Sequence, residues 1–279
     1  MYLASLIRYA HKTNGLVTAY VYGSMGHGKT SYALWTAYAV LGSWDRVLDY
    51  LFFDIGEAVD LMIDYLKKGK RIPILILDDA GFYLNRLTWW EKDKILFMEL
   101  FNLARTMCSG IIFTSPTHEL PRQILAKTNY RVKVRPLEED EGGEVASEVL
   151  EVAKEYGIEE GGVAVARGFI VEVLPSFFKI VRKDYLDYFP LWYPHKIYEE
   201  YNKIRINYVK RKLEEIKKTR KAEREELFEK ALELYKKTKN PKEVYHFLKP
   251  KLPASTAWGW AYIRIPRIFG EKSQQAGQE

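Results

Sequence analysis

The sequence predicts an α/β fold: a doubly wound, mostly parallel sheet followed by a small C-terminal helical domain. Over about the first 195 residues, short apolar runs typical of buried strands alternate with segments of helical periodicity, the pattern of a sheet covered by helices. After this point the chain is strongly charged and only helical periodicity remains. A chain of 279 residues has room for one such core and one appendage.

The expected strands are residues 16–22, 49–55, 73–79, 110–113 and 130–134, with a strand pair at 163–173 and 177–181 that extends the sheet edge around a turn at 174–176. Helices are expected at residues 30–41, 59–66, 91–108 and 119–127. The acidic stretch 137–162, which contains a short helical pattern, is interpreted as an exposed insertion. The aromatic and proline-rich residues 185–194 are interpreted as a crossing segment.

A glycine-rich motif lies between the first strand and its helix. Residues 23–30 read Gly-Ser-Met-Gly-His-Gly-Lys-Thr and fit G-x-x-x-x-G-K-[ST]. In this motif the glycines let backbone N–H groups turn inward around a polyphosphate, the lysine reaches the outer phosphates, and the threonine hydroxyl joins the Mg²⁺ shell. The motif predicts a P-loop that binds ATP and Mg²⁺. Its expected ligand-binding residues are Gly23, Ser24, Met25, Gly26, His27, Gly28, Lys29, Thr30 and Ser31.

A second motif ends the apolar run at residues 73–79, Pro-Ile-Leu-Ile-Leu-Asp-Asp. Such a run is typical of a strand buried on both faces of a parallel sheet. Open α/β sheets bind ligands at the carboxyl ends of their strands, so we expect Asp78 and Asp79 to lie near the glycine-rich loop. The alternative is that Asp79 only caps the turn at residues 80–81, as aspartate commonly does.

Together the two motifs resemble P-loop ATPases of the additional-strand division, AAA/DnaA-like or FtsK/HerA-like, of the kind found in archaeal viruses and plasmids. The resemblance extends through residue 134. It implies that Thr30 and Asp78 hold Mg²⁺ and that Asp79 polarises the attacking water. Most members carry glutamate at the position of Asp79, which is shorter by one methylene.

The same resemblance implies a further strand between the P-loop strand and the strand that ends at the acidic pair. The tip of that strand would present a polar sensor to the γ-phosphate, and Thr114 and Ser115 match this position. We assign Thr114 to catalysis together with Lys29 and Asp79. The alternative is that residues 114–116 form an ordinary turn at the end of a strand.

Phosphoryl transfer also requires a cation near the γ-phosphate. In the oligomeric ATPases that this chain resembles, an arginine from a neighbouring subunit supplies it, which implies a homo-oligomer. Arg105, Arg122 and Arg131 are expected near the relevant edge of the sheet, and the sequence does not choose among them.

Composition restricts the compartment. The one cysteine, Cys108, excludes an internal disulfide framework, and its apolar neighbours indicate a core residue and not a nucleophile. No apolar run approaches the roughly 20 residues that span a bilayer, and the N-terminus lacks the features of a signal peptide. We therefore expect no membrane association and a cytoplasmic location, in the host cytoplasm if the source is a virus or plasmid.

The sequence suggests an ATPase domain at 1–195, a charged helical linker at 196–222, a helical domain at 223–270 and a disordered tail at 271–279. From residue 196 onward there are 21 Lys/Arg and 12 Asp/Glu. This excess of positive charge indicates DNA or another polyanion as a partner. A solvated, salt-bridged helix would have the same composition.

The C-terminal domain should contain three short helices. A break at residues 239–240, Pro241 at the start of the second helix and Ser255 as N-cap of the third set their limits. The arrangement resembles a helix-turn-helix or winged-helix DNA-binding module. Its last helix would enter the major groove, with Thr256, Trp258 and Arg264 at bases and Lys249, Lys251 and Arg267 at phosphates. The alternative is a bundle that only packs against the ATPase domain or makes oligomer contacts.

The leading hypothesis from the sequence is an oligomeric ATPase that acts on DNA in replication initiation, helicase loading, or translocation and packaging. The alternative is a DNA-binding regulator switched by nucleotide with little hydrolysis, which Asp79 in place of glutamate slightly favours. A third hypothesis, a small-molecule kinase, lacks the arginine-rich lid that such kinases usually need.

Overall fold

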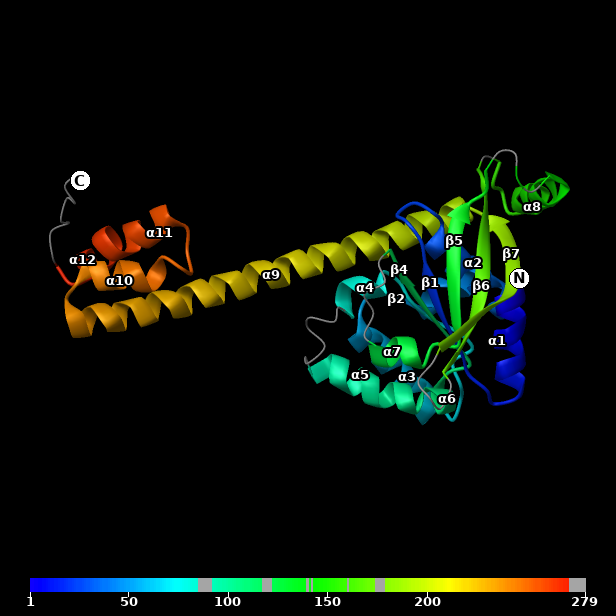
Figure 1. Cartoon of the computed structure of the whole chain (residues 1–279), viewed down its shortest axis with the longest axis horizontal. Coiled ribbons are helices and arrows are strands. Elements are labelled where there is room, and N and C mark those ends of the chain that lie inside the picture. The colour runs from blue at the N-terminus through cyan, green and yellow to red at the C-terminus, as the bar shows by residue number, and fades with distance from the viewer. Residues whose placement is uncertain are drawn as a thin grey trace. The chain divides into compact units, whose positions relative to one another are not determined.

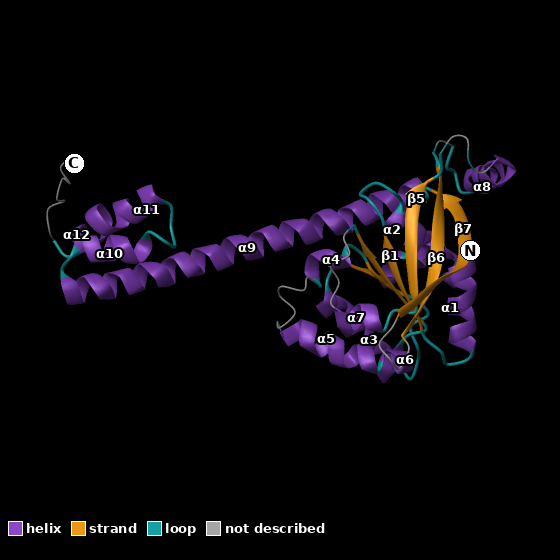
Figure 2. Cartoon of the chain, viewed as in Figure 1, coloured by secondary structure: helices purple, strands orange, loops and turns teal. Residues whose placement is uncertain are grey.

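The computed structural model describes residues 1–84, 92–116, 122–138, 141, 143–159, 161–173 and 179–270. The protein is of the α/β class and contains a seven-stranded sheet (Figures 1 and 2). Contacts divide the chain into two compact units, Met1–Arg205 and Ile206–Glu279. The first unit contains the sheet, and the second is helical. The expected tail at 271–279 lies outside the described residues.

The strands are, in chain order, β1 (Val17–Tyr22), β2 (Leu51–Phe52), β3 (Leu75–Leu77), β4 (Gly110–Ser115), β5 (Tyr130–Pro136), β6 (Val163–Val173) and β7 (Lys179–Pro190). Their order in space is β2-β3-β4-β1-β5-β6-β7. Strands β1 to β5 pair with one another in parallel, whereas the β5–β6 and β6–β7 pairs are antiparallel. The sheet is therefore mixed, with a parallel part that includes every strand expected before residue 137.

Strand β4 lies between β1 and β3. Val21 pairs with Thr114 and Leu77 pairs with Phe113, so the carboxyl ends of the three strands meet at one edge of the sheet. The apolar side chains of β3 and most of β4 are fully buried, as a strand inside a parallel sheet requires. The additional strand implied by the sequence resemblance is thus present in the expected place.

Strand β7 corrects one prediction. Residues 185–194 were expected to form a crossing segment, but β7 continues to Pro190. Tyr185, Asp187 and Phe189 are buried, whereas Leu186 between them is 41% exposed. This period of two is typical of a strand with one buried face, and the aromatic and proline content concealed it. The turn expected at residues 174–176 lies outside the described residues.

The helices of the first unit, apart from the start of α9, are α1 (Tyr2–Lys12), α2 (Lys29–Leu41), α3 (Ile55–Lys67), α4 (Ala80–Tyr83), α5 (Lys92–Asn102), α6 (Ala104–Met107), α7 (Arg122–Ala126) and α8 (Gly143–Glu155), with short turns η1 (Trp44–Arg46) and η2 (Leu48–Tyr50). The helix expected at 91–108 is interrupted at Leu103. Residues 119–121 of the next expected helix are outside the described residues. Helices α1 and α2 pack on each other and on β1 and β4, whereas α3, α5 and α6 pack together.

Helix α1 was not predicted, although its sequence carried the signal. Leu3, Ala4, Ile7 and Ala10 recur at helical spacing and are buried. Ile7 lies against β4 at Gly110, where a Cβ atom would come within 2.7 Å of the Ile7 side chain. Helix α1 therefore closes one face of the sheet.

Helix α8 corrects the interpretation of residues 137–162 as a merely exposed insertion. Ala153 in α8 is fully buried, and Tyr156 just beyond it shares a 3.0 Å hydrogen bond with the hydroxyl of Tyr38. The rings of Trp35, Tyr38, Trp44 and Tyr156 pack with centroids 4.7 to 6.4 Å apart. Aromatic packing therefore fixes this segment to α2.

The second unit begins within α9 (His195–Thr238) and continues with α10 (Pro241–Leu248), α11 (Ala254–Trp258), the π turn η4 (Gly259–Arg264) and α12 (Ile265–Ile268). Residues 196–222 belong to α9, which continues through the expected start of the next helix. The break at 239–240 is confirmed, because Asn240 caps α10 by accepting a hydrogen bond from the Lys242 amide. Ser255 is not an N-cap: α11 begins at Ala254, preceded by Pro253.

Candidate functional site

The glycine-rich loop at residues 23–30 joins β1 to α2 as its sequence predicts. Gly28 has a φ of +88° and occupies the N-cap position of α2, a left-handed conformation that favours glycine. Gly23 lies so close to β5 that a Cβ atom would collide with the Val134 carbonyl oxygen. The loop therefore needs glycine at position 28 for its backbone conformation and at position 23 because a side chain has no room there.

The Lys29 ammonium group lies over this loop and donates a 2.8 Å hydrogen bond to the carbonyl oxygen of Ser24. Burial lowers the pKa of Lys29, and the charges of Asp79 and Asp78 oppose that shift. The lysine is thus held inside the loop by a carbonyl group that an anionic ligand could replace.

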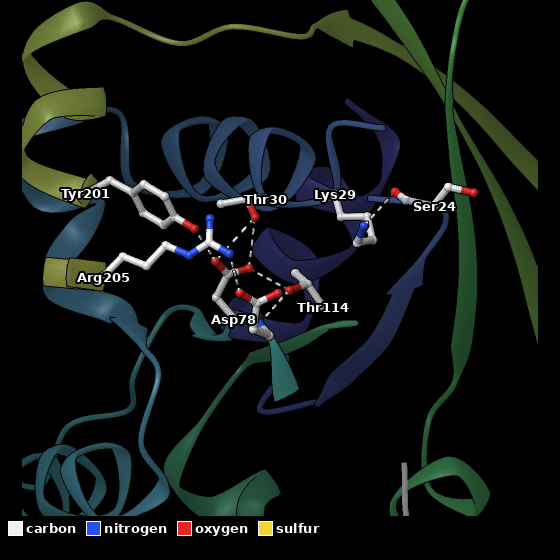
Figure 3. Close-up of polar contacts among 8 residues, drawn as sticks. Ser24, Lys29, Thr30, Asp78, Thr114, Tyr201 and Arg205 are labelled. Atoms are coloured by element: carbon white, nitrogen blue, oxygen red, sulfur yellow. Dashed lines mark hydrogen bonds and ion pairs between the residues drawn. The ribbon is translucent and has the colours of Figure 1, made fainter. Parts of the chain in front are cut away.

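Asp78 follows β3 and is fully buried. Its carboxylate accepts hydrogen bonds from three hydroxyl groups, each on a different element (Figure 3). Thr30 of α2 donates to its carboxylate oxygens at 3.1 and 3.2 Å. Thr114 of β4 donates to Oδ1 at 2.5 Å, and Tyr201 of α9 donates to Oδ2 at 2.8 Å. Each oxygen of the Asp78 carboxylate therefore has two hydroxyl contacts.

The electrostatics of Asp78 reflect both burial and these partners. Burial raises the pKa of Asp78 and the neighbouring Asp79 raises it further, whereas the hydrogen bonds from Thr114, Tyr201 and Thr30 lower it. The net shift is upward, so the charged form is incompletely compensated within the protein. A cation at this carboxylate would complete the compensation.

Asp79 lies in a different environment from Asp78. Its backbone is left-handed, with φ at +51°, and its amide donates a 3.0 Å hydrogen bond to Thr114 Oγ1. Although Asp79 precedes α4, its side chain makes no capping hydrogen bond, which argues against the capping alternative. Its carboxylate instead pairs with Arg205 Nη2 at 3.0 Å, and the two side chains are 35% and 50% exposed. Such exposed pairs contribute about 0.2–1 kcal/mol.

Sequence reasoning missed Tyr201 and Arg205, which α9 brings to the site one turn apart (Figure 3). The Tyr201 ring is buried beside Phe53 and Tyr193, and burial raises the pKa of its hydroxyl well above the ordinary value. The signal was the seven-residue repeat of Ile197, Tyr201, Ile204 and Tyr208, in which Ile197, Tyr201 and Tyr208 are buried and Ile204 is exposed. It marked the packing face of a helix, whereas we interpreted this stretch as a linker.

Some of the other predicted site residues lie beside the acidic pair and others do not. Met25 is largely exposed, and the Ser31 hydroxyl donates to the Leu191 carbonyl oxygen at 2.5 Å. Thr114 is bonded to Asp78 and to the Asp79 amide, while Ser115 beside it is fully buried. The glycine-rich loop, Lys29, Thr30, Asp78, Asp79 and Thr114 are brought together.

The three candidate arginines are not equivalent. Arg105 lies at the opposite edge of the sheet, where its Nε atom donates to the Asn14 carbonyl oxygen at 2.9 Å, so its expected position near the site was wrong. Arg131 is on β5, paired with Tyr20, and within the described residues its buried Nε atom has no hydrogen-bond partner. The side chain of Arg122 lies outside the described part of the structure.

The donor set suits a magnesium ion that arrives with a phosphate ligand. Among the described residues there is no group of three or more His, Cys, Asp or Glu side chains that could hold a metal by itself. Mg²⁺ commonly needs only one or two carboxylates, with phosphate oxygens and water completing its shell. Thr30 and Asp78 offer a hydroxyl and a carboxylate next to the glycine-rich loop, which fits that requirement.

The residues proposed for DNA contact belong to the second unit. The Arg264 guanidinium lies over the Phe228 ring at 4.3 Å, and the Lys251 ammonium lies over Phe247 at 3.7 Å. Trp258 is 39% exposed and stacks on Tyr262. A core of Ala231, Tyr235, Val244, Leu248, Ala257, Trp260, Ala261 and Ile265 supports these residues. Cations and aromatic rings are therefore interleaved on this unit.

No helix in the described part of the chain is long and apolar enough to cross a membrane. No protein-family model matches the sequence. The chain is 39% identical over 125 residues to an uncharacterized protein, B-251, of Sulfolobus spindle-shape virus 1, a match that covers 42% of this chain and 50% of the relative. It is 29% identical over 102 residues to the uncharacterized protein ORF286 of Acidianus two-tailed virus, covering 36% of each. The chain thus spans half or less of these curated relatives.

Proposed function

We propose that the chain is a P-loop ATPase that binds ATP with Mg²⁺, hydrolyses it and acts on DNA. The observation that carries the proposal is the hydrogen bond from Thr30 Oγ1 to Asp78 Oδ1, which is 3.1 Å long and joins residues 48 positions apart in the sequence. It joins the residue after the motif lysine to the acidic pair, which is the juxtaposition that magnesium-assisted phosphoryl transfer needs. The position of β4 between β1 and β3 supports the additional-strand division.

In the proposed reaction the N–H groups of the glycine-rich loop and Lys29 bind the phosphates. Thr30 and Asp78 would hold Mg²⁺, which neutralises charge on the β- and γ-phosphates. Thr114 orients Asp78 through its hydrogen bond to Oδ1. In this reaction Asp79 would orient the attacking water once its carboxylate is released from Arg205.

The DNA part of the proposal is supported by the charge of the C-terminal third and by the cations and aromatic rings of the second unit. Basic surfaces gain free energy by releasing counterions from phosphates, and exposed aromatic rings stack on bases. We propose replication initiation, helicase loading or DNA translocation as the process, with a homo-oligomer as the working form. Both relatives belong to viruses, which is consistent with a viral or plasmid source.

The test is ATP turnover with and without single- and double-stranded DNA, with particle mass followed in parallel. Lys29→Ala should abolish turnover, because the ammonium group no longer reaches the outer phosphates. Lys70→Ala, which removes an exposed lysine beyond α3, is the control and should retain it. Normal hydrolysis by Lys29→Ala would refute the assignment of the site.

The second candidate is a DNA-binding regulator in which ATP sets the assembly state with little hydrolysis. The ion pair between Asp79 and Arg205 favours it, because the carboxylate expected to orient water is already engaged. Negligible turnover with either DNA form, together with a change of particle mass on ATP addition, would select this function over the first.

A further inference from the structure

We propose that Arg205 is a catalytic residue of this site, supplied by the same chain, and that it moves from Asp79 to the terminal phosphate of bound ATP. This inference rests on the proposed ATPase function and names the cation that the site needs. It replaces the expectation of an arginine from a neighbouring subunit. Arg205 belongs to the first compact unit, together with the glycine-rich loop and the acidic pair.

The position of Arg205 is set by a neighbour on its own helix. Residues four apart lie on one face of a helix, and Tyr201, four residues earlier, is anchored by its 2.8 Å hydrogen bond to Asp78 Oδ2. Arg205 therefore extends from a fixed point toward the same acidic pair, as Figure 3 shows. Burial opposes the charge of the guanidinium group there, but Tyr201, Asp79 and Asp78 together outweigh it and raise the pKa of Arg205.

The contact that Arg205 makes with Asp79 is one that a phosphate can replace. It runs from Nη2 to Oδ2 at 3.0 Å, and the arginine side chain is half exposed. A guanidinium group carries five N–H donors in a planar fork, and phosphate oxygens accept two of them side by side. A terminal phosphate at the glycine-rich loop also carries more negative charge than one carboxylate, so it should win the exchange.

The exchange would accomplish two things in one movement. It places positive charge where the transition state of phosphoryl transfer develops negative charge, and it frees Asp79. The water oxygen then forms a bond to the γ-phosphorus while the bond to the β–γ bridging oxygen breaks and ADP leaves with that electron pair. One water proton passes to Asp79 and then to solvent.

The test compares Arg205→Ala and Arg205→Lys with Lys203→Ala, which removes an exposed cation two residues away on the same helix. Turnover and the affinity for a fluorescent ATP analogue with Mg²⁺ are measured for each. We expect Arg205→Ala to lower turnover at least about 100-fold, since arginines in this role are worth about 10³–10⁵, while nucleotide affinity changes only a few-fold. Arg205→Lys should recover part of the loss, and Lys203→Ala should match the wild type.

A mixing experiment separates supply by the same chain from supply by a neighbour. Arg205→Ala and Lys29→Ala are mixed and reassembled; if the arginine acted on a neighbouring subunit, intact sites would form and turnover would return. We expect none. Restored turnover, or wild-type turnover in Arg205→Ala alone, would overturn the inference while leaving the ATPase proposal in place. Absence of nucleotide binding by the wild-type protein would overturn both.

Discussion

The two edges of the parallel strands use charge in opposite ways. At the amino edge, Arg71 donates to the carbonyl oxygens of Gly15 at 2.5 Å and Cys108 at 2.7 Å, and Arg105 donates to Asn14. At the carboxyl edge, hydroxyl groups surround the buried Asp78, while Lys29 and Arg205 make contacts that a phosphate could take over. At the amino edge, Arg71 and Arg105 hydrogen-bond to backbone carbonyl groups and so stabilise the fold. At the carboxyl edge, we propose that a phosphate takes over the contacts of Lys29 and Arg205.

The largest effect is expected at the carboxyl edge, from Asp78→Asn. Turnover should fall at least about 100-fold, because loss of even an indirect metal contact costs about 10–100-fold. Stability should not fall with it. The pKa of Asp78 is raised by burial, so its contribution to stability is present at low pH and is lost as pH rises through the raised value.

Melting temperatures of wild type and Asp78→Asn at two pH values would check this. At pH 7.5 the variant should melt at or above the wild type, because asparagine carries no buried charge. The difference should shrink as the pH is lowered through the raised pKa of Asp78, because the carboxylate then takes up a proton. A variant that melts well below the wild type at neutral pH would show that Asp78 stabilises the fold. The proposed difference between the two edges of the sheet would then be wrong.

An intermediate effect is expected at the amino edge from Arg71→Met. The change leaves the Gly15 and Cys108 carbonyl oxygens without their charged donor, and hydrogen bonds to charged groups contribute about 1.5–3 kcal/mol each. Because Arg71 is only half-buried and water can replace part of its donors, we expect a loss of about 2–3 kcal/mol, which should lower the melting temperature by about 5–10 °C. Turnover below that temperature should stay at the wild-type level, and the exposed neighbour Lys70→Ala should change neither quantity. Loss of turnover in folded Arg71→Met would contradict the division of roles.

The smallest effect is expected at Cys108, which is also at the amino edge. Burial raises the pKa of its thiol to about 12, so almost none is ionised at pH 8. A thiol reagent at pH 8 should leave turnover unchanged over a time that fully modifies the urea-unfolded protein. Rapid modification of the folded protein, or inactivation by it, would show that this edge opens in solution.

The sequence predicted the parts of the site that depend on local pattern. The glycine-rich loop, Thr30, Asp78 and Thr114 each follow or precede an apolar run, and parallel pairing brings the ends of such runs to one edge. The position of β4 between β1 and β3 was implied by the family resemblance, and the full order of the seven strands was not predicted. The sequence also contained the helical spacing of α1 and the alternating burial pattern of β7, but we did not use them. In β7 the aromatic and proline content concealed the alternation.

The contribution of α9 could not be predicted in this way. Tyr201 meets Asp78 across 123 residues and Arg205 meets Asp79 across 126, and neither lies beside a motif. Their positions depend on how α9 packs, which is a tertiary property. At Ser255 a local pattern was present but predicted the wrong boundary. Serine is a favourable N-cap residue, yet α11 begins one residue earlier, at Ala254.

The left-handed backbone of Asp79 narrows which amino acids this position can accept. Asparagine and aspartate are enriched several-fold among the non-glycine residues that adopt a positive φ, and longer side chains adopt it less readily. Of the residues that tolerate this turn of the chain, only aspartate brings a negative charge. A longer acidic side chain at position 79, such as glutamate, would therefore strain the backbone that follows β3.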